Sequence, residues 1–250
     1  MRLAIAPDPS LLDSVTAQRG LLVPAGARAL VLIAHPDEAS RQQAGQGFVA
    51  DVLHANGFAT LSFSLHTSQD TAAGLRPPGM VQGRQRLCAL LDWVLVQPGQ
   101  GARPLALIGV GHAASACVAM AARADRIKIR SLVLLDARAD RLTRHLVRLR
   151  QPALFVLGQC DRRLLARQRM AVRDIPAGHR LEMLGLPTLP RPAAGALEAF
   201  ACLALDWMDR ALAQPEPVAG DGGGPSGPVS AGLREVGPEA SGRSQGTAAA

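Results

Sequence analysis

The stretch 104–122, PLALIGVGHAASACVAMAA, is where the sequence could place a side chain for nucleophilic chemistry. It reads as a short apolar strand, a turn of small residues through Gly109, Gly111 and His112, and a helix without charge. A sharp strand-to-helix turn exposes one side chain at the top of a sheet, and in the motif Gly-x-Ser-x-Gly that side chain is a serine nucleophile. Aligned on Gly111, the motif puts Ala113 at the serine position, so the reactive atom is missing there.

Two nearby side chains could act as displaced nucleophiles. Ser115 lies two residues beyond Ala113, which rotates it by about 200° around the helix axis. Cys117 shares a helical face with Ala113 but lies about 6 Å further along the helix. We expect Ser115 to be a small structural residue and Cys117 to be a core thiol, with catalysis by Ser115 as the alternative.

Two histidines, His35 and His112, follow predicted strands at the carboxyl edge of the sheet, where α/β proteins form their sites. Without an adjacent hydroxyl or thiol, a histidine base has nothing to activate. The amides of Ala114 and Ser115 open a helix and could still bind a small carboxylate or phosphate. These four residues are therefore the candidate ligand-binding set. We expect no cofactor and no metal, because no pair of the four cysteines has metal-ligand spacing.

The elements that must position these residues alternate between strands and helices. Apolar runs predict strands at 28–34, 59–65, 105–110, 131–135, 152–157 and 180–184, with short edge strands at 1–6 and 20–24. Helical periodicity predicts helices near 48–55, 87–98, 113–122, 139–149, 162–173 and 197–212. Polar residues predict loops at 36–42 and 67–83. This alternation indicates an α/β fold, with a mostly parallel sheet covered by helices on both faces.

Composition divides the 250 residues into three segments. We expect an N-terminal segment at 1–19, one α/β domain at 20–213 and a disordered tail at 214–250, where Gly, Pro, Ser and Ala dominate. No apolar run approaches the roughly 20 residues needed to cross a bilayer, so no membrane partner is expected. The N-terminus also lacks the pattern of a secretory signal, which predicts a cytoplasmic protein.

Four stretches in this order resemble the α/β-hydrolase fold, and more narrowly the dienelactone hydrolase-like proteins. They are GARALVLIAHPDEASR at 26–41, GFATLSFSL at 57–65, IGVGHAASACVAMAA at 108–122, and ALFVLGQCDRRLL at 153–165 followed by ALDW at 204–207. The resemblance implies an α/β-hydrolase-like sheet without a large cap domain. It also implies a serine nucleophile, an aspartate and a histidine, in that chain order.

The resemblance assigns these three positions to particular residues. Asp161 retains the acid position, directly after a strand, and Ala113 occupies the nucleophile position. The histidine is expected soon after the strand at 180–184, where Thr188 or Leu189 stands; we take Thr188 as its approximate position. Two losses in one triad predict a protein that does not hydrolyse esters and acts by binding a ligand or a protein partner. The alternative is an active carboxylic-ester or lactone hydrolase that uses Ser115.

Basic charge supplies a third hypothesis, an arginine-rich polyanion binder. The net charge is +7, and Lys128 is the single lysine. Within the helix predicted at 139–149, Arg141, Arg144 and Arg148 share one face and could contact phosphates. We expect a solvated face instead, because no nucleic-acid-binding motif accompanies it. Aromatic residues are 3% of the chain, which leaves few stacking platforms, so a nucleic-acid partner is not expected.

Overall fold

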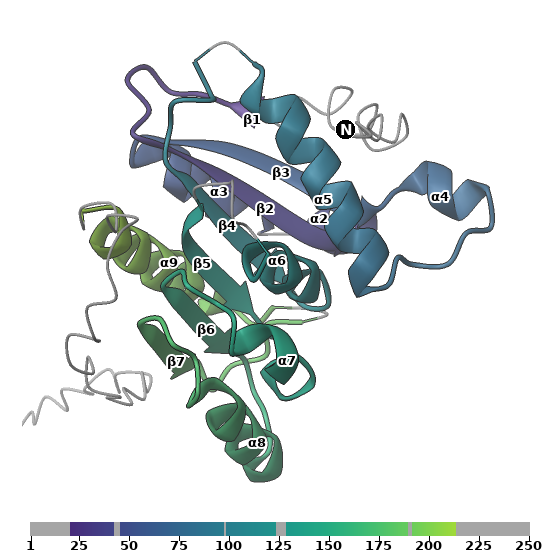
Figure 1. The fold of residues 1–250 in the computed structure, drawn as a ribbon, viewed down its shortest axis with the longest axis vertical. Helices are drawn as coiled ribbons and strands as arrows, with labels where there is room; N and C mark the ends of the chain where they lie inside the picture. The colour runs from purple at the N-terminus through teal and green to yellow at the C-terminus, as the bar shows by residue number, and fades with distance from the viewer. Residues whose placement is uncertain (1–20, 43–45, 98, 124–128, 190–191, 214–250) are drawn as a thin grey trace, which may run out of the picture.

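Seven strands form one sheet in the order β1-β3-β2-β4-β5-β6-β7, in which only β1 is antiparallel to its neighbour (Figure 1). The computed structural model describes residues 21–42, 46–97, 99–123, 129–189 and 192–213. The predicted strand at 1–6, the whole of the predicted N-terminal segment at 1–19 and the tail at 214–250 lie outside this range. The strands are β1 Leu21–Leu22, β2 Ala29–Asp37, β3 Phe58–His66, β4 Leu105–Val110, β5 Ile129–Leu135, β6 Ala153–Leu157 and β7 His179–Met183.

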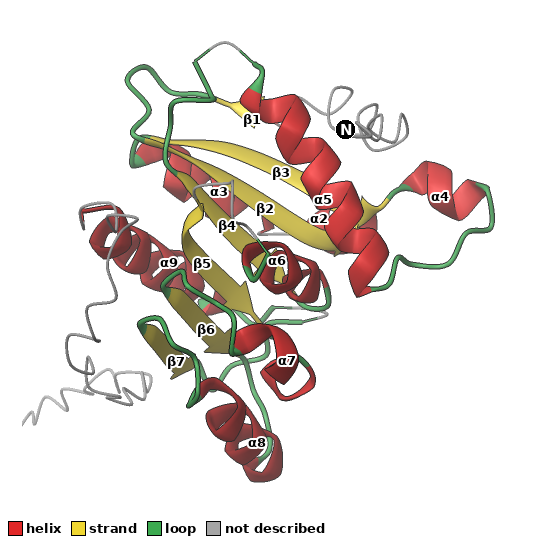
Figure 2. Ribbon diagram, viewed as in Figure 1, coloured by secondary structure: helices red, strands yellow, loops and turns green. Residues whose placement is uncertain are grey.

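Helices cover both faces of the sheet (Figure 2). They are α2 Glu38–Gln42, α3 Gln46–Ala55, α4 Ser68–Ala72, α5 Met80–Leu95, α6 Ala113–Ala121, the 3-10 helix η1 Ala139–Arg141, α7 Thr143–Leu146, α8 Arg162–Val172 and α9 Ala196–Ala213. Side chains of α5, α6 and α7 pack on one face, and those of α3 and α9 pack on the other. Among the described residues, no helix has the length and apolarity to span a membrane.

The predicted α/β class is confirmed, because the central strands are buried on both faces. Every residue of β4 and β6 is buried, as are the first eight residues of β2. Continuous apolar runs suit such strands, since each side chain meets a helix layer whichever way it points. The carboxyl ends of parallel strands all lie at one edge of the sheet, so residues far apart in sequence meet there.

The loop predicted at 36–42 is wrong. β2 continues through His35 to Asp37, because β3 pairs with it as far as His66, and α2 begins immediately afterwards. The Asp37 carboxylate accepts a hydrogen bond of 2.7 Å from the Ser40 amide, which satisfies a free amide at the start of the helix. The long loop predicted at 67–83 also contains α4 and the first turn of α5.

The single arginine-rich helix predicted at 139–149 is also wrong. η1 and α7 replace it, and Leu142 between them has φ −114° and ψ 6°, outside the helical range. The Arg138 guanidinium donates two hydrogen bonds to Asp140, at 2.9 and 2.8 Å. The arginines that follow therefore do not lie along one helix face.

A buried ion pair anchors the segment that follows β3. Asp70 is 3% exposed, and the Arg86 guanidinium donates to both of its oxygens at 2.5 and 2.7 Å. The Thr67 amide donates to the same carboxylate at 2.8 Å, which completes a capping box at the start of α4. Hydrogen bonding from Arg86 lowers the pKa of Asp70 to about 2. The carboxylate therefore stays ionised, and it ties α4 to α5.

Gly109 allows α6 to start directly against β4. A Cβ atom at this position would lie 2.6 Å from the Ala114 Cα and 3.1 Å from the Cys117 Sγ. Overpacking a buried contact costs about 1–3 kcal/mol, so Gly109→Ala is expected to lower the free energy of unfolding by that amount. Urea titration followed by circular dichroism measures the change.

Gly47 provides the matched control for this substitution. It lies in α3, and a Cβ there would meet no atom within 4 Å. Gly47→Ala is therefore expected to stabilise the protein by about 0.5–1 kcal/mol, the usual difference between the two residues in a helix. Equal effects at the two glycines would contradict the close approach of α6 to β4.

Candidate functional site

Asp136 connects three segments at the carboxyl edge of the sheet. It directly follows β5 and has a φ of 52°, in the left-handed region that non-glycine residues seldom adopt. One carboxylate oxygen accepts a hydrogen bond of 2.8 Å from the Gly158 amide, just after β6. The other accepts a hydrogen bond from the Thr188 hydroxyl, in the loop between β7 and α9. One acidic side chain therefore holds the ends of two strands and a long loop together.

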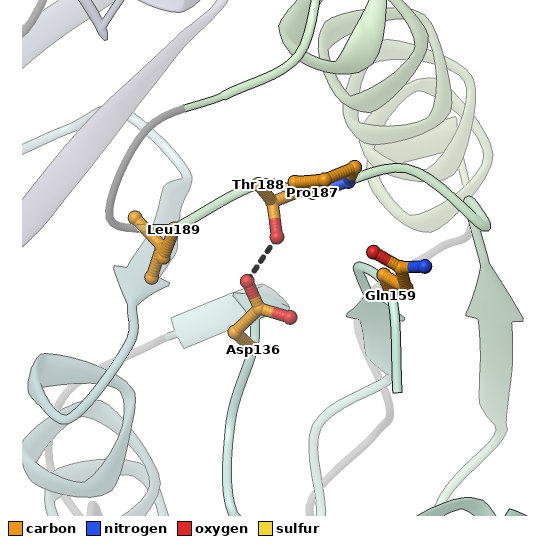
Figure 3. A pocket seen from close by; sticks show the side chains of 5 residues that line it. All are labelled: Asp136, Gln159, Pro187, Thr188 and Leu189. Carbon is orange, nitrogen blue, oxygen red and sulfur yellow. Dashed lines mark hydrogen bonds between the residues drawn. The ribbon is translucent and has the colours of Figure 1, made fainter. Parts of the chain in front are cut away.

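A cleft of about 310 Å³ opens beside this carboxylate. Its walls are Asp136, Gln159, Pro187, Thr188 and Leu189. Figure 3 shows the Thr188 hydroxyl directed at the Asp136 carboxylate. The lining combines a carboxylate, an amide, a hydroxyl and two apolar side chains, so it is more polar than most small-molecule sites.

The hydrogen bond from Thr188 to Asp136 should contribute strongly to stability. Thr188 is 1% exposed, so Thr188→Val leaves one carboxylate oxygen without its partner. Hydrogen bonds to charged groups contribute about 1.5–3 kcal/mol, and we expect a loss of that size in the free energy of unfolding. Thr60→Val is the matched control, because the equally buried Thr60 hydroxyl has no hydrogen-bond partner in the structure. Chemical denaturation should show little or no loss for the control, and equal losses would contradict the role of Asp136.

The turn between β4 and α6 centres on Gly111. This residue has a φ of 55°, and its amide donates a hydrogen bond of 2.8 Å to the Leu135 carbonyl, at the end of β5. A Cβ atom at Gly111 would lie 3.2 Å from Leu189 Cδ1, so it would face the cleft wall. Ala113 is the first residue of α6 and is wholly buried, with its methyl group in the core cluster on the α5–α6 face.

The acid and base positions expected from sequence, Asp161 and Thr188, make hydrogen bonds to different partners. Asp161 is exposed and caps α8, where its carboxylate accepts a hydrogen bond of 2.6 Å from the Leu164 amide. Asp161 does not line the cleft. Thr188 does line the cleft, but its hydroxyl is bonded to Asp136.

The two candidate histidines have different surroundings. His35 is 1% exposed, and its Nε2 lies 3.0 Å from the Ser62 hydroxyl. Burial, reinforced by nearby Arg41, lowers the pKa of His35 to about 3, so this ring is neutral at pH 7. His112 is exposed at the start of α6, and partial burial lowers its pKa as well. Neither histidine lines the cleft.

The remaining candidates lie in the first turns of α6. Ala114 is buried and Ser115 is half-buried, and the Ser115 amide donates a hydrogen bond of 3.1 Å to the His112 carbonyl. Cys117 is wholly buried, and burial raises the pKa of its thiol to about 12. A thiol with that pKa stays protonated and is a poor nucleophile. Among the residues that the structure describes, no group of three His, Cys, Asp or Glu side chains could hold a metal ion.

Sequence reasoning missed Asp136 and Gln159. A signal for Asp136 was present, because it directly follows the apolar run at 131–135, next to the strand of the small-residue turn. The positional argument that selected Asp161 after its strand applies equally to Asp136. Gln159 has no comparable signal, since its place in the cleft depends on how the loop after β7 folds back. The backbone N–H of Gln159 donates a hydrogen bond of 2.9 Å to the backbone carbonyl of Leu186 in that loop.

Comparison with known proteins identifies relatives by sequence and similar proteins by structure, although no protein-family profile matches the chain. Two curated relatives come from Mycobacterium tuberculosis, strains CDC 1551 and H37Rv, and carry a provisional phosphoribosyl transferase name. Each is 30% identical over 220 residues, which is 85% of this chain and 49% of the relative. The chain thus spans about half the length of these relatives, and their name describes proteins of which the matched stretch is a part.

Solved structures match over most of the described fold. A dienelactone hydrolase from Anabaena variabilis has a TM-score of 0.68 and 26% identity, over 76% of this chain and 89% of its own. A cold-adapted esterase from an Arctic intertidal metagenomic library has a TM-score of 0.58 and 15% identity, over 76% of this chain and 86% of its own. Est1E from Butyrivibrio proteoclasticus has a TM-score of 0.58 and 12% identity, over 78% and 93%. The chain is therefore a protein of the α/β-hydrolase fold, similar in structure to dienelactone hydrolases and esterases.

Proposed function

We propose that this protein does not hydrolyse esters and instead binds a small molecule in the cleft beside Asp136. The observation that carries the proposal is Gly111, which occupies the positive-φ position of the turn between β4 and α6. A nucleophile elbow presents its reactive side chain from a strained position of this kind. Glycine has no side chain, so a hydroxyl is missing from the point where attack would begin.

The same geometry supports a different assignment of the lost triad positions. We place the nucleophile position at Gly111 instead of Ala113, because the Ala113 methyl group packs into the core. We place the base position at Leu189, the residue that a Cβ at Gly111 would meet. A leucine cannot accept a proton, so the proposed nucleophile and base positions both lack a reactive group.

Charge narrows the class of ligand that we propose for the cleft. The Asp136 carboxylate lines it, and a carboxylate repels the small carboxylate or phosphate that the sequence suggested. A ligand that carries an amine or hydroxyl donor fits this wall better, because a charged acceptor forms strong hydrogen bonds with such groups. Calorimetric titration with benzylamine and benzoate tests this, and benzylamine should bind more tightly. Asp136→Asn should remove the preference, and tighter binding of benzoate would contradict the assignment.

Loss of hydrolysis is tested on the wild-type chain. Purified protein should turn over para-nitrophenyl acetate and a small lactone no faster than a heat-denatured sample. It should also remain unlabelled by a fluorophosphonate probe. Labelling at Ser115 that disappears in Ser115→Ala would replace this proposal with the alternative of an ester hydrolase that uses a displaced serine.

A further inference from the structure

Arginines gather on and beside the helices at the β6–β7 end of the sheet, and none of them lines the cleft. Between residues 139 and 172 the chain carries eight arginines, two aspartates and no lysine or glutamate. α7 contacts both η1 and α8, so these elements form one surface (Figure 1). Seven of the arginines are exposed and form no ion pair with the residues that the structure describes, and we name them the arginine surface. They are Arg141, Arg144, Arg148, Arg150, Arg162, Arg163 and Arg169.

Both aspartates in this segment are already committed to structural contacts. Asp140 is held by two hydrogen bonds from Arg138, and Arg167 lies 3.6 Å from it. Gln168 also donates a hydrogen bond of 3.2 Å to Asp140, which fastens α8 to η1. Asp161 caps α8. Asp140 therefore holds two basic elements together, and of the arginine surface it interacts electrostatically with Arg141, without forming an ion pair.

His145 reports the positive potential of this region. It lies in α7 and is half-buried. Burial lowers its pKa first, and the positive charges of Arg123, Arg148 and Arg144 lower it further. Three guanidinium groups thus act on one imidazole, so α7 and the end of α6 share a concentrated positive field. Such a field raises the local concentration of anions.

We propose that the arginine surface binds a flexible linear polyphosphate chain by charge alone. Guanidinium groups match phosphate oxygens in bidentate geometry, which favours a phosphate polymer over monovalent anions. η1, α7 and α8 include no Phe, Trp or Tyr, so these elements lack the large aromatic side chains on which successive bases of a single-stranded nucleic acid stack.

The shape of the surface distinguishes among phosphate polymers. Arg141 lies on η1 and Arg144 on α7, whereas Arg162, Arg163 and Arg169 lie on α8. Arg148 and Arg150 lie in the segment between α7 and β6, so the arginines are distributed over several elements and not along one helix. A DNA duplex is stiff over about 150 base pairs, and it can therefore contact only part of such a surface. Insertion into a membrane strengthens binding through exposed apolar side chains, and here the large ones are Val147, directly after α7, and Met170 in α8. A flexible polyphosphate can follow all of the elements. This inference is independent of the cleft.

The first test is a salt titration with inorganic polyphosphate, followed by fluorescence anisotropy of the labelled polymer. We expect binding that weakens steeply as the salt concentration rises. By analogy with flexible single strands, each phosphate contact contributes about −0.7 to the slope of log K against log salt. An Arg144→Ser, Arg148→Ser, Arg163→Ser variant should therefore have a slope smaller by about 2. Unchanged affinity and slope in this variant, or no binding at low salt, would overturn the proposal.

Control variants test where the polyphosphate binds, and control ligands test which kind of phosphate polymer or surface the protein prefers. Arg76 is exposed in the segment between α4 and α5, away from the arginine surface, and Arg76→Ser should bind as the wild type does, unlike Arg163→Ser. A DNA duplex with the same number of phosphates, and phosphatidylserine vesicles, should bind more weakly than polyphosphate. Equal or tighter binding of either one would show that the flexible chain is the wrong partner. Circular dichroism confirms that each variant is folded.

Discussion

A Gly111→Ser, Leu189→His double variant is expected to hydrolyse para-nitrophenyl acetate at least about 100-fold faster than the wild type, the lower range of what a positioned general base contributes. The serine would supply a nucleophile at the positive-φ turn, and the histidine would supply a base at the residue that this side chain meets. Removing Leu189 also takes away the side-chain atom that lies 3.2 Å from the new Cβ. Initial rates over a range of ester concentrations measure the gain.

The control for this gain is the Ala113→Ser, Thr188→His double variant, which follows the alignment of the sequence motif. It should remain inactive, because Ala113 packs into the core and Thr188 is bonded to Asp136. Activity in this variant and not in the first would show that Ala113 is the nucleophile position after all. Each serine alone should be inactive, because a hydroxyl without a base is a weak nucleophile.

Replacing one aspartate at a time in the active double variant shows which aspartate assists the introduced histidine. Asp136→Asn and Asp161→Asn are compared in the active double variant. Asp136 lies closer to the proposed base position, since it is bonded to the neighbouring Thr188, whereas Asp161 is exposed and caps α8. We therefore expect the greater loss of turnover with Asp136→Asn. A greater loss with Asp161→Asn would return the acid role to the residue that the resemblance selected.

The second large effect is acid destabilisation through His35. Its pKa is about 3 in the folded protein, against an ordinary value of 6.5. As the pH falls below 6.5, the unfolded chain takes up a proton that the folded protein does not bind, so folding is disfavoured. One such group lowers the free energy of unfolding by about 1.4 kcal/mol per pH unit until its folded pKa is reached. Urea titrations at successive pH values measure this slope.

His35→Gln isolates this contribution, because an amide can still bond the Ser62 hydroxyl and does not titrate. The variant should lose much of the slope between pH 6 and pH 4 (the interval that lies between the two pKa values of His35). His112 and His145 also have lowered pKa values and should leave a residual slope of the same sign. Asp70 has a pKa of about 2 in the folded protein, against an ordinary value of 3.8. It therefore lowers the free energy of unfolding only below about pH 4, where the unfolded chain protonates this carboxylate first. An identical pH profile in His35→Gln would show that His35 is not buried as a neutral ring.

The amino-acid sequence was sufficient to predict the class of fold and most of its elements. Continuous apolar runs identified the strands at the centre of the sheet, and their alternation with amphipathic helices indicated parallel order. These signals are local, because a strand buried on both faces needs apolar residues at every position. Local signals failed where a side chain found a partner outside its own element. In the helix predicted at 139–149, Leu142 leaves the helical range, and Asp140 bonds to Arg138 and to Gln168 of α8.

Which residues make up the site beside Asp136 could be seen only in the folded protein. Asp136, Gly158 and Thr188 are far apart along the chain, and they meet because β5, β6 and the loop after β7 end at the same edge of the sheet. The alignment of the Gly-x-Ser-x-Gly motif on the small-residue turn could not be chosen from sequence either, since GVGHAAS has a small residue at almost every position. The backbone angle of Gly111 and the burial of Ala113 separate the two registers. Both are set by how α6 packs on the sheet, which is a long-range contact that local sequence does not encode.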